Sequence, residues 1–267
     1  MKVRIFDEAS ALGAALCERL GAEGHEVCLD GDDAEVLVEL RQPPGNDVAG
    51  AGAAIARFAH LLDRAAAKRT PVVFASSADV YGATDKLPFG VEQPVDRHRG
   101  TRGAGLRAQE LLAQAWSHQR GVPVTALRLF EVYGPEVEGF VADAIHAARS
   151  GAPLKVPGGL AQRRDFVFLD DVVEAFLRAI ERPPEPLGEL PAYAVHNVGS
   201  GSPTPRSRIV ELVEAKTARR IRCEEVPSAQ ELVHSWADVR ELQQAYGFRP
   251  RTPLSEGIAR TVESSGP

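Results

Sequence analysis

Residues 2–13, KVRIFDEASALG, lead an apolar strand directly into a helix, and this strand–turn–helix unit sets the fold class. The strand part is apolar, and residues 10–21 place Leu12, Leu16 and Leu20 on one helical face. The two patterns then alternate downstream, with strands at 35–40, 72–76 and 124–130 and helices at 48–68 and 101–120. Such alternation predicts an α/β fold with a mostly parallel sheet covered by helices on both faces.

The composition is that of an ordinary globular protein. Hydrophobic residues make up 44% and charged residues 25% of the 267 residues, and the formal net charge is −6. This charge argues against a nucleic-acid partner, and no run approaches the roughly 18 apolar residues that a membrane span needs. The chain starts in strand-like VRIF without a signal peptide, and Cys17, Cys28 and Cys223 lack metal-ligand spacing. We expect a cytoplasmic protein with reduced cysteines, no metal site and no membrane contact.

The pattern becomes less regular after Gly134. Helical patterns continue at residues 140–150, 170–182, 209–218 and 240–246. We therefore expect two parts, a sheet domain over residues 1–134 and a smaller α/β lobe that occupies most of residues 135–267. Part of residues 160–200 is expected to return to the sheet domain.

Five stretches together resemble one known family. They are VVFASSADVYG (72–82), VTALRLFEVYGP (124–135), RRDFVFLDDVVEAFLRAIE (163–181), HNVGSGSP (196–203) and ADVRELQQAYGFRPRTPLSEGIARTVE (237–263). In this order they are similar to the extended short-chain dehydrogenase/reductases of the NAD-dependent epimerase/dehydratase family. The resemblance implies a Rossmann-like sheet domain, a C-terminal substrate lobe, NAD(P) as cofactor and usually a nucleotide sugar as substrate.

The cofactor turn departs from this family pattern. The resemblance implies a GxxGxxG turn, and its three positions hold Asp7, Ser10 and Gly13. The glycines allow the backbone to approach a pyrophosphate at the N-terminus of the next helix. Here Ser10 adds bulk, and the carboxylates of Asp7 and Glu8 would repel a phosphate by about 4 kcal/mol each at 4 Å and an effective dielectric constant of 20. We expect no nicotinamide cofactor, with these residues serving instead to cap the helix.

The adenosine side of the cofactor site also looks shortened. Asp30 matches the acidic residue that the resemblance assigns to the ribose, but only residues 31–34 separate it from the strand at 35–40. A crossover between parallel strands takes about a dozen residues. We therefore expect a sheet truncated at this edge, with fewer than seven strands. Residues 26–29 would then form either a hairpin with 35–40 or no strand at all.

The catalytic pattern of the family is a Ser or Thr followed by Tyr-x-x-x-Lys on a helix. Counting back from ELLAQAWSHQRGVPV puts the Tyr at Thr101 and the Lys at Gly105, so both are lost. Ser77 matches the Ser/Thr, and Asp79 matches the Glu that acts as acid/base in dehydratase members. An alternative is that Ser77 and Asp79 only bond the local backbone at a strand end.

On the substrate side, the resemblance assigns Arg164 to the nucleotide diphosphate. The usual Asn is Glu131 here, and a second diphosphate Arg is Ser228. We therefore expect a diphosphate sugar to bind weakly, which leaves room for a neutral or cationic small molecule. His98 lies in a loop expected to cover the site, where it could titrate near neutral pH.

The candidate catalytic residues are thus Asp79, Ser77, His98 and Glu131, and the candidate substrate-binding residues are Arg164, Tyr133 and Thr101. Three functions remain open. The first is a cofactor-independent acid–base enzyme of the lyase or isomerase type, catalysing proton transfer, elimination or cyclisation, for example in specialised metabolism. The second is a non-catalytic pseudoenzyme that binds a partner. The third is an NAD(P)-dependent nucleotide-sugar epimerase or dehydratase.

A homodimer is the expected assembly. Members of the resembling family commonly pair through the two helices that match residues 48–68 and 101–120. These helices carry more apolar positions than one sheet face needs, among them Ile55, Phe58 and Leu111. The alternative is that all of them face the sheet.

Overall fold

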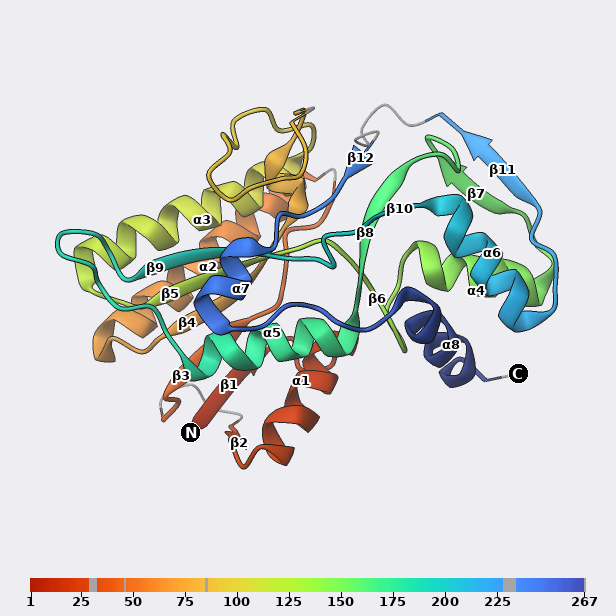
Figure 1. Ribbon diagram of the computed structural model, residues 1–267. Helices are drawn as coiled ribbons and strands as arrows, with labels where there is room; N and C mark the ends of the chain where they lie inside the picture. Colours follow the sequence, from red (N-terminus) through yellow and green to blue (C-terminus); the bar gives the residue numbers. More distant parts are fainter. Residues whose placement is uncertain (29–32, 46, 85, 228–233, 267) are drawn as a thin grey trace.

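The computed structural model describes residues 1–28, 33–45, 47–84, 86–227 and 234–266 (Figure 1). In this part of the chain six parallel strands form the main sheet, in the order β2-β1-β3-β4-β5-β9. The strands are β1 (Lys2–Phe6), β2 (Glu26–Val27), β3 (Val36–Glu39), β4 (Val72–Ser77), β5 (Val124–Leu129) and β9 (Tyr193–Val198). The predicted Rossmann-like parallel sheet is confirmed, and its described strands number fewer than seven.

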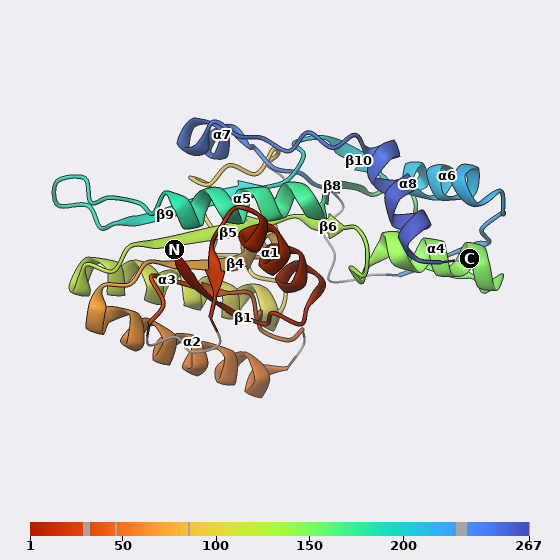
Figure 2. The same ribbon diagram turned by 90° about the horizontal axis from the view of Figure 1, so that it is seen from below.

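Two helical layers cover the sheet. On one face lie α1 (Ala11–Ala22) and α5 (Leu169–Glu181), and on the other lie α2 (Val48–Lys68) and α3 (Thr101–Arg120) (Figure 2). Leu16 of α1 and Phe176 of α5 share one buried cluster with strand residues. Phe58 of α2 shares a second cluster with Phe74 of β4 and Ala113 of α3. The sheet is therefore buried on both faces, which explains the nearly continuous apolar runs of its strands.

The truncated edge of the sheet corrects one expectation. Residues 26–29 were expected to pair with 35–40 as a hairpin or to form no strand. Instead, β2 and β3 both run parallel to β1, one on each side, and Val27 and Val36 are both in register with Val3. β2 thus ends level with the start of β3, two strand spacings or about 10 Å away. The long crossover that full-length strands require is unnecessary for a strand of two residues.

A smaller lobe follows the sheet along the chain (Figure 1). Its core packs α4 (Phe140–Ser150), α6 (Arg206–Thr217) and α8 (Leu254–Ser264) with β7 (Leu154–Pro157) and β11 (Cys223–Val226). A second small sheet joins β6 (Glu131–Tyr133), β8 (Arg163–Phe168), β10 (Pro203–Pro205) and β12 (His234–Ser235). This small sheet begins directly after the carboxyl end of β5, so it connects that end of the main sheet to the lobe.

Later segments return to the main sheet. α5 packs on the face that α1 covers, β9 pairs with β5, and α7 (Arg240–Tyr246) packs on β9 through Leu242 and Tyr246. The loop between α5 and β9 projects from the end of the molecule away from the lobe (Figures 1 and 2). None of the described helices is long and apolar enough to cross a bilayer.

Candidate functional site

A cavity of about 620 Å³ lies at the carboxyl ends of β4 and β5. Its lining comes from the sheet domain at Ser77, Asp79 and Arg102, and from β8 and α6 at Arg164 and Arg206. Ligands of open α/β sheets bind outside the carboxyl ends of the strands, so the cavity has the expected position for a site.

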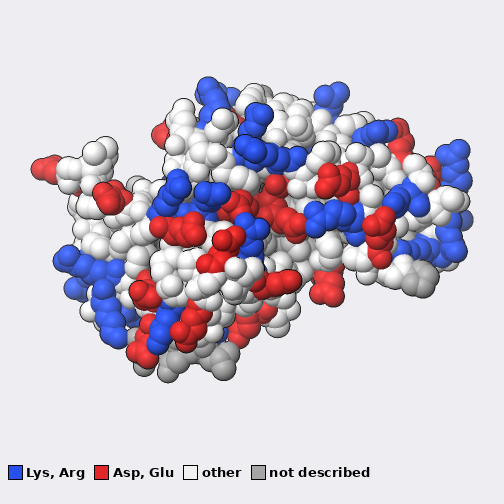
Figure 3. Space-filling model, turned by 60° about the horizontal axis from the view of Figure 1, so that its bottom comes forward, with Lys and Arg blue, Asp and Glu red and all other residues white. Residues whose placement is uncertain are grey.

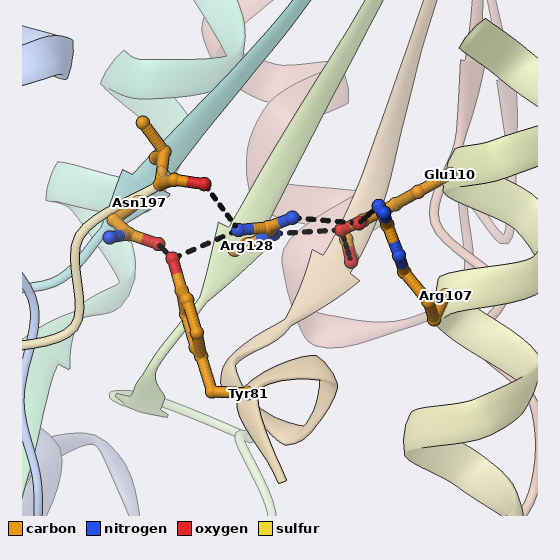
Figure 4. A network of polar contacts seen from close by, with 7 residues as sticks. Tyr81, Arg107, Glu110, Arg128 and Asn197 are labelled. Carbon is orange, nitrogen blue, oxygen red and sulfur yellow. Dashed lines mark hydrogen bonds and ion pairs between the residues drawn. The ribbon is translucent and has the colours of Figure 1, made fainter. Parts of the chain in front are cut away.

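A buried polar network fixes the sheet side of the cavity (Figure 4). Arg128 of β5 donates from Nε and Nη2 to the two carboxylate oxygens of Glu110 on α3, both at 2.8 Å. Its Nη1 donates to the Tyr81 hydroxyl at 3.0 Å, and that hydroxyl donates to Asn197 Oδ1 at 2.7 Å. Burial raises the pKa of Glu110, but the bonds and charge of Arg128 outweigh it, and the net shift is downward. The network holds α3 against the sheet at Glu110, which lies about two helical turns after Arg102.

The end of β4 presents Ser77 and Asp79. The Ser77 hydroxyl accepts the Asp79 backbone N–H at 3.2 Å and so caps the short 3₁₀ helix η1 (Ala78–Tyr81). Both residues line the cavity, and the Asp79 side chain is 48% exposed. Ser77 therefore does bond the local backbone, while Asp79 keeps a carboxylate in contact with the cavity.

Arg102 is the charged residue of α3 that faces Asp79. Its Nη1 donates to Asp79 Oδ2, and its Nη2 donates to Gln42 Oε1. Gln42 in turn donates from Nε2 to the carbonyl of Ser76 at 2.9 Å. A continuous chain of polar contacts thus connects Gln42, three residues beyond β3, with the end of β4 and the first turn of α3.

Thr101 does not line the cavity, although its neighbours Gly100, Arg102 and Gly103 do. A helical step of one residue turns the side chain by about 100°, so a count that is one residue short selects the wrong face. Gly105 faces elsewhere as well, since a Cβ there would lie 3.2 Å from the Pro43 ring. The face of α3 that carries Arg102 continues at Leu106, which is fully buried. On this part of α3 the cavity is therefore lined by Arg102 and Gly103, not by Thr101 or Gly105.

Glu131 and Arg164 both line the cavity and lie together on the lobe side. Arg164 Nε is 3.8 Å from Glu131 Oε2. Arg206 joins them because β10 pairs with β8, with Thr204 opposite Arg164. The Arg206 guanidinium stacks on Phe140, 4.9 Å from the ring centroid, and donates to the Pro157 carbonyl at 2.7 Å. Arg206 carries no signal in the sequence that would place it here, because only the strand pairing reveals its position.

The remaining candidates lie outside the lining of this cavity. Tyr133 is 3% exposed in the core of the lobe, and burial and then the Asp171 carboxylate raise its pKa. His98 lies in the loop before α3, in which Arg99 and Gly100 line the cavity instead. Ser228 lies outside the described residues, as does Asp30. In the described part of the chain, no group of three or more His, Cys, Asp or Glu residues could hold a metal ion.

The turn before α1 does not fit a dinucleotide. Ser10 caps the helix: its Oγ accepts the Gly13 N–H at 3.1 Å and donates to the Asp7 carbonyl at 2.7 Å. The amide that could bind a phosphate is therefore already bonded. Asp7 has φ +86°, and Glu8 forms an ion pair with Arg4 at 3.4 Å. Two carboxylates thus occupy the turn that would approach a pyrophosphate.

The cavity shows the same misfit at its catalytic side. Its described lining contains no tyrosine and no lysine, and residues 7–13 do not contribute to it. The side chains of Gln42 and Arg102 bridge β3 and α3 there. The described lining of this cavity therefore offers neither a Tyr nor a Lys, the two residue types that the family pattern uses beside nicotinamide.

The sheet, the lobe and the cavity between them define an extended short-chain dehydrogenase/reductase fold. A model described as "NAD dependent epimerase/dehydratase family" matches residues 51–199, and the chain belongs to this family. The match begins within α2, so the turn at residues 7–13 lies before it.

Several characterised and solved proteins are similar to this chain. A "Probable UDP-glucuronate 4-epimerase" of Rhizobium meliloti (strain 1021) is 31% identical over 210 residues, covering 72% of this chain and 61% of that protein. Protein CapI of Staphylococcus aureus is 29% identical over 206 residues, covering 72% and 62%. The chain thus matches about three-fifths of the length of these relatives.

Two solved structures share the fold over nearly the whole chain. MoeE5, solved with UDP-glucose and NAD, has a TM-score of 0.87 at 24% identity and covers 99% of this chain and 98% of its own. UDP-glucuronic acid 4-epimerase from Bacillus cereus, solved with UDP-glucuronic acid and NAD, has a TM-score of 0.86 at 18% identity and covers 99% and 98%. At these identities the likeness establishes the fold alone.

Proposed function

We propose that this protein binds a nucleotide sugar in the cavity and catalyses acid–base chemistry on the sugar ring. The observation that carries the proposal is the pair of arginines on the lobe side of the cavity, Arg164 and Arg206. Asp79, paired with Arg102, lies at the opposite side of the cavity, beyond the carboxyl end of β4. Arginine is suited to bidentate contact with phosphate oxygens, so the lobe side suits a diphosphate.

Relatives and charge pairing both favour a nucleotide sugar over the neutral or cationic substrate that Glu131 suggested. The relatives include UDP-glucuronate 4-epimerases. Glu131 is already paired with Arg164. A second carboxylate of the lining, Asp165, accepts the backbone N–H groups of Ser200, Gly201 and Ala237 at 2.6–2.9 Å. Neither carboxylate is therefore an isolated negative charge facing a diphosphate.

Asp79 and Ser77 supply the acid–base groups of this proposal. A carboxylate within reach of a substrate C–H or O–H can accelerate proton transfer by about 10²–10⁴-fold. Asp79 is exposed to the cavity, and Ser77 stands two residues before it with a hydroxyl that lines the same space.

A second candidate function is NAD(P)-dependent epimerisation or dehydration of a nucleotide sugar. The family match and the similarity to UDP-glucuronate 4-epimerases favour it. It would require a nicotinamide dinucleotide to bind against the turn at Asp7 and Glu8, where we found a misfit.

Calorimetry and cofactor analysis of the purified protein test these proposals. We expect heat on titration with UDP, and no NAD(P) in the supernatant of the denatured protein by mass spectrometry. Arg164→Gln should weaken UDP binding by at least about tenfold, since charge-assisted bonds contribute about 1.5–3 kcal/mol. Arg163→Gln is the matched control, because Arg163 is exposed and lies outside the cavity lining.

Each other outcome has a distinct meaning. Absence of heat with UDP and with UDP-sugars would reject the nucleotide-sugar proposal. Stoichiometric NAD(P) in the purified protein would replace the first function by the second. Tight binding without conversion of any UDP-sugar would leave a binding protein and reject the catalytic half.

A further inference from the structure

Asp79 and Arg102 form an ion pair that faces the cavity from η1 and from the first turn of α3. The two side chains are 48% and 39% exposed, so both are accessible to a ligand. Gln42 binds the other side of the guanidinium and is itself bonded to the Ser76 carbonyl at 2.9 Å. The cation is therefore anchored to the backbone of β4 beside a carboxylate.

Arginines line the cavity on two sides. Arg164 and Arg206 come from β8 and α6, and Arg102 and Arg99 come from α3 and the loop before it. A nucleoside diphosphate accounts for the first pair only. Arg102 of the second pair is bonded to Asp79. Asp79 can act only on a sugar that extends to this side of the cavity, so Arg102 would lie beside that sugar.

We propose that Arg102 binds the carboxylate of a nucleotide-linked sugar acid and that Asp79 removes the proton from the ring carbon next to that carboxylate. This inference rests on the proposed function and specifies its substrate class and reaction. A guanidinium has five N–H donors, so Arg102 can bind the ligand carboxylate on one edge while it retains Asp79 on another. The cation also cannot be neutralised near neutral pH.

The step balances without an oxidant or a reductant. The C–H bond next to the carboxylate breaks, and Asp79 takes the proton. The electron pair moves into the neighbouring carbon–carbon bond, and the carboxylate becomes an enediolate with its added charge on the oxygens. Arg102 donates hydrogen bonds to those oxygens, which stabilises the charge as it develops. Return of a solvent-exchanged proton from Asp79 to the same carbon restores the substrate, and departure of the neighbouring hydroxyl with the proton from Asp79 releases water and leaves a carbon–carbon double bond.

Proton exchange in D₂O tests this step directly. UDP-glucuronic acid is incubated with NAD-free protein, and loss of the H5 signal is followed by ¹H NMR. We expect exchange that added NAD does not accelerate, and none with UDP-glucose, which lacks the carboxylate. Asp79→Asn should slow exchange about 10²–10⁴-fold. Arg102→Gln should slow it about 10²–10³-fold, as loss of an oxyanion donor does.

Controls separate this chemistry from misfolding and from failure of the proposed function. Arg97→Gln alters an exposed arginine in the same loop that does not line the cavity, and it should exchange at the wild-type rate. Circular dichroism and UDP affinity should be unchanged in Asp79→Asn. UDP binding without H5 exchange would overturn this inference and leave the proposed function standing. Absence of UDP binding would overturn both.

Discussion

Glu110 and Arg128 face each other in the buried layer between α3 and β5, joined by two parallel hydrogen bonds of 2.8 Å (Figure 4). Glu110 is 0% and Arg128 2% exposed, so the pair is isolated from water. Ser76 and Arg107 donate to the same carboxylate, at 2.7 and 3.0 Å. The pair thus ties the helix that carries Arg102 to the strands whose ends form the cavity.

Glu110→Gln is expected to lower the free energy of unfolding by about 3–5 kcal/mol, because it leaves the buried Arg128 without its counter-charge. Urea denaturation at pH 7 measures this loss. The control is Glu211→Gln, which removes an ion pair with Arg208 whose side chains are 60% and 54% exposed. That variant should change stability by less than about 1 kcal/mol. Equal losses in both variants would contradict the structural importance of the buried pair.

The buried side chain of His196 is expected to make the folded protein less stable in mild acid. It is 7% exposed on β9 against the Tyr246 ring, and burial lowers its pKa from 6.5 to about 4. Between these two pKa values the imidazole is protonated in the unfolded chain but not in the folded protein. The contribution of His196 to the free energy of unfolding is therefore complete above pH 6.5 and decreases as the pH falls toward 4. The expected loss between pH 7 and pH 5 is about 2 kcal/mol.

Urea midpoints of the wild type and of His196→Gln at the two pH values measure this effect. The variant should lose less stability than the wild type on acidification. His60→Gln is the control, since His60 is exposed on α2. A wild-type difference that persists unchanged in His196→Gln would assign the pH dependence to other groups.

Substitutions at Asp7 and at Ser10, in the turn before α1, are expected to change stability in opposite directions. Ser10→Ala removes the helix cap and should lower stability by about 1 kcal/mol. Asp7→Gly relieves a positive φ of +86° and should raise stability, by an amount of order 1 kcal/mol. Urea denaturation gives both values, and neither variant should gain affinity for NAD by calorimetry. A destabilised Asp7→Gly would show that the carboxylate contributes more than the strained backbone costs.

The homodimer remains a prediction, and α2 and α3 offer a surface for it. Leu111 on α3 is 49% exposed and Val48 on α2 is 76% exposed. Analytical ultracentrifugation should give a dimer for the wild type and a monomer for Leu111→Asp. Leu187→Asp, in the projecting loop and 76% exposed, is the control that should remain dimeric. A monomeric wild type would reject this interface.

The face of the molecule drawn in Figure 3 gives no simple electrostatic guide to a partner. Lys and Arg side chains are interspersed with Asp and Glu over that face and do not form one continuous field (Figure 3). This distribution does not provide the broad basic surface typical of nucleic-acid binders. The arginines that line the cavity are thus a local feature of that site.

The sequence was sufficient for the sheet because buried parallel strands are apolar throughout and alternate with helices of clear period. It was not sufficient for β2, whose two residues are too few to show any period. The site was predicted where residues follow a strand directly, as at Ser77 and Asp79. It was missed at Arg102, because a gapless count cannot fix the rotation of a helix. It was missed again at Arg206, because only the pairing of β10 with β8 brings this residue near Arg164.

Val27 of β2 and Val36 of β3 are both in register with Val3 of β1, and this arrangement affects whether another copy of the protein can add a strand to the sheet. Because β2 and β3 flank β1, the first strand of the chain is an interior strand and presents no open backbone edge. The strand that does lie outermost there is only two residues long. Long exposed edges recruit further strands and promote aggregation, and very short edge strands prevent this. A β2 of two residues therefore offers little backbone for edge-to-edge pairing on that side of the sheet.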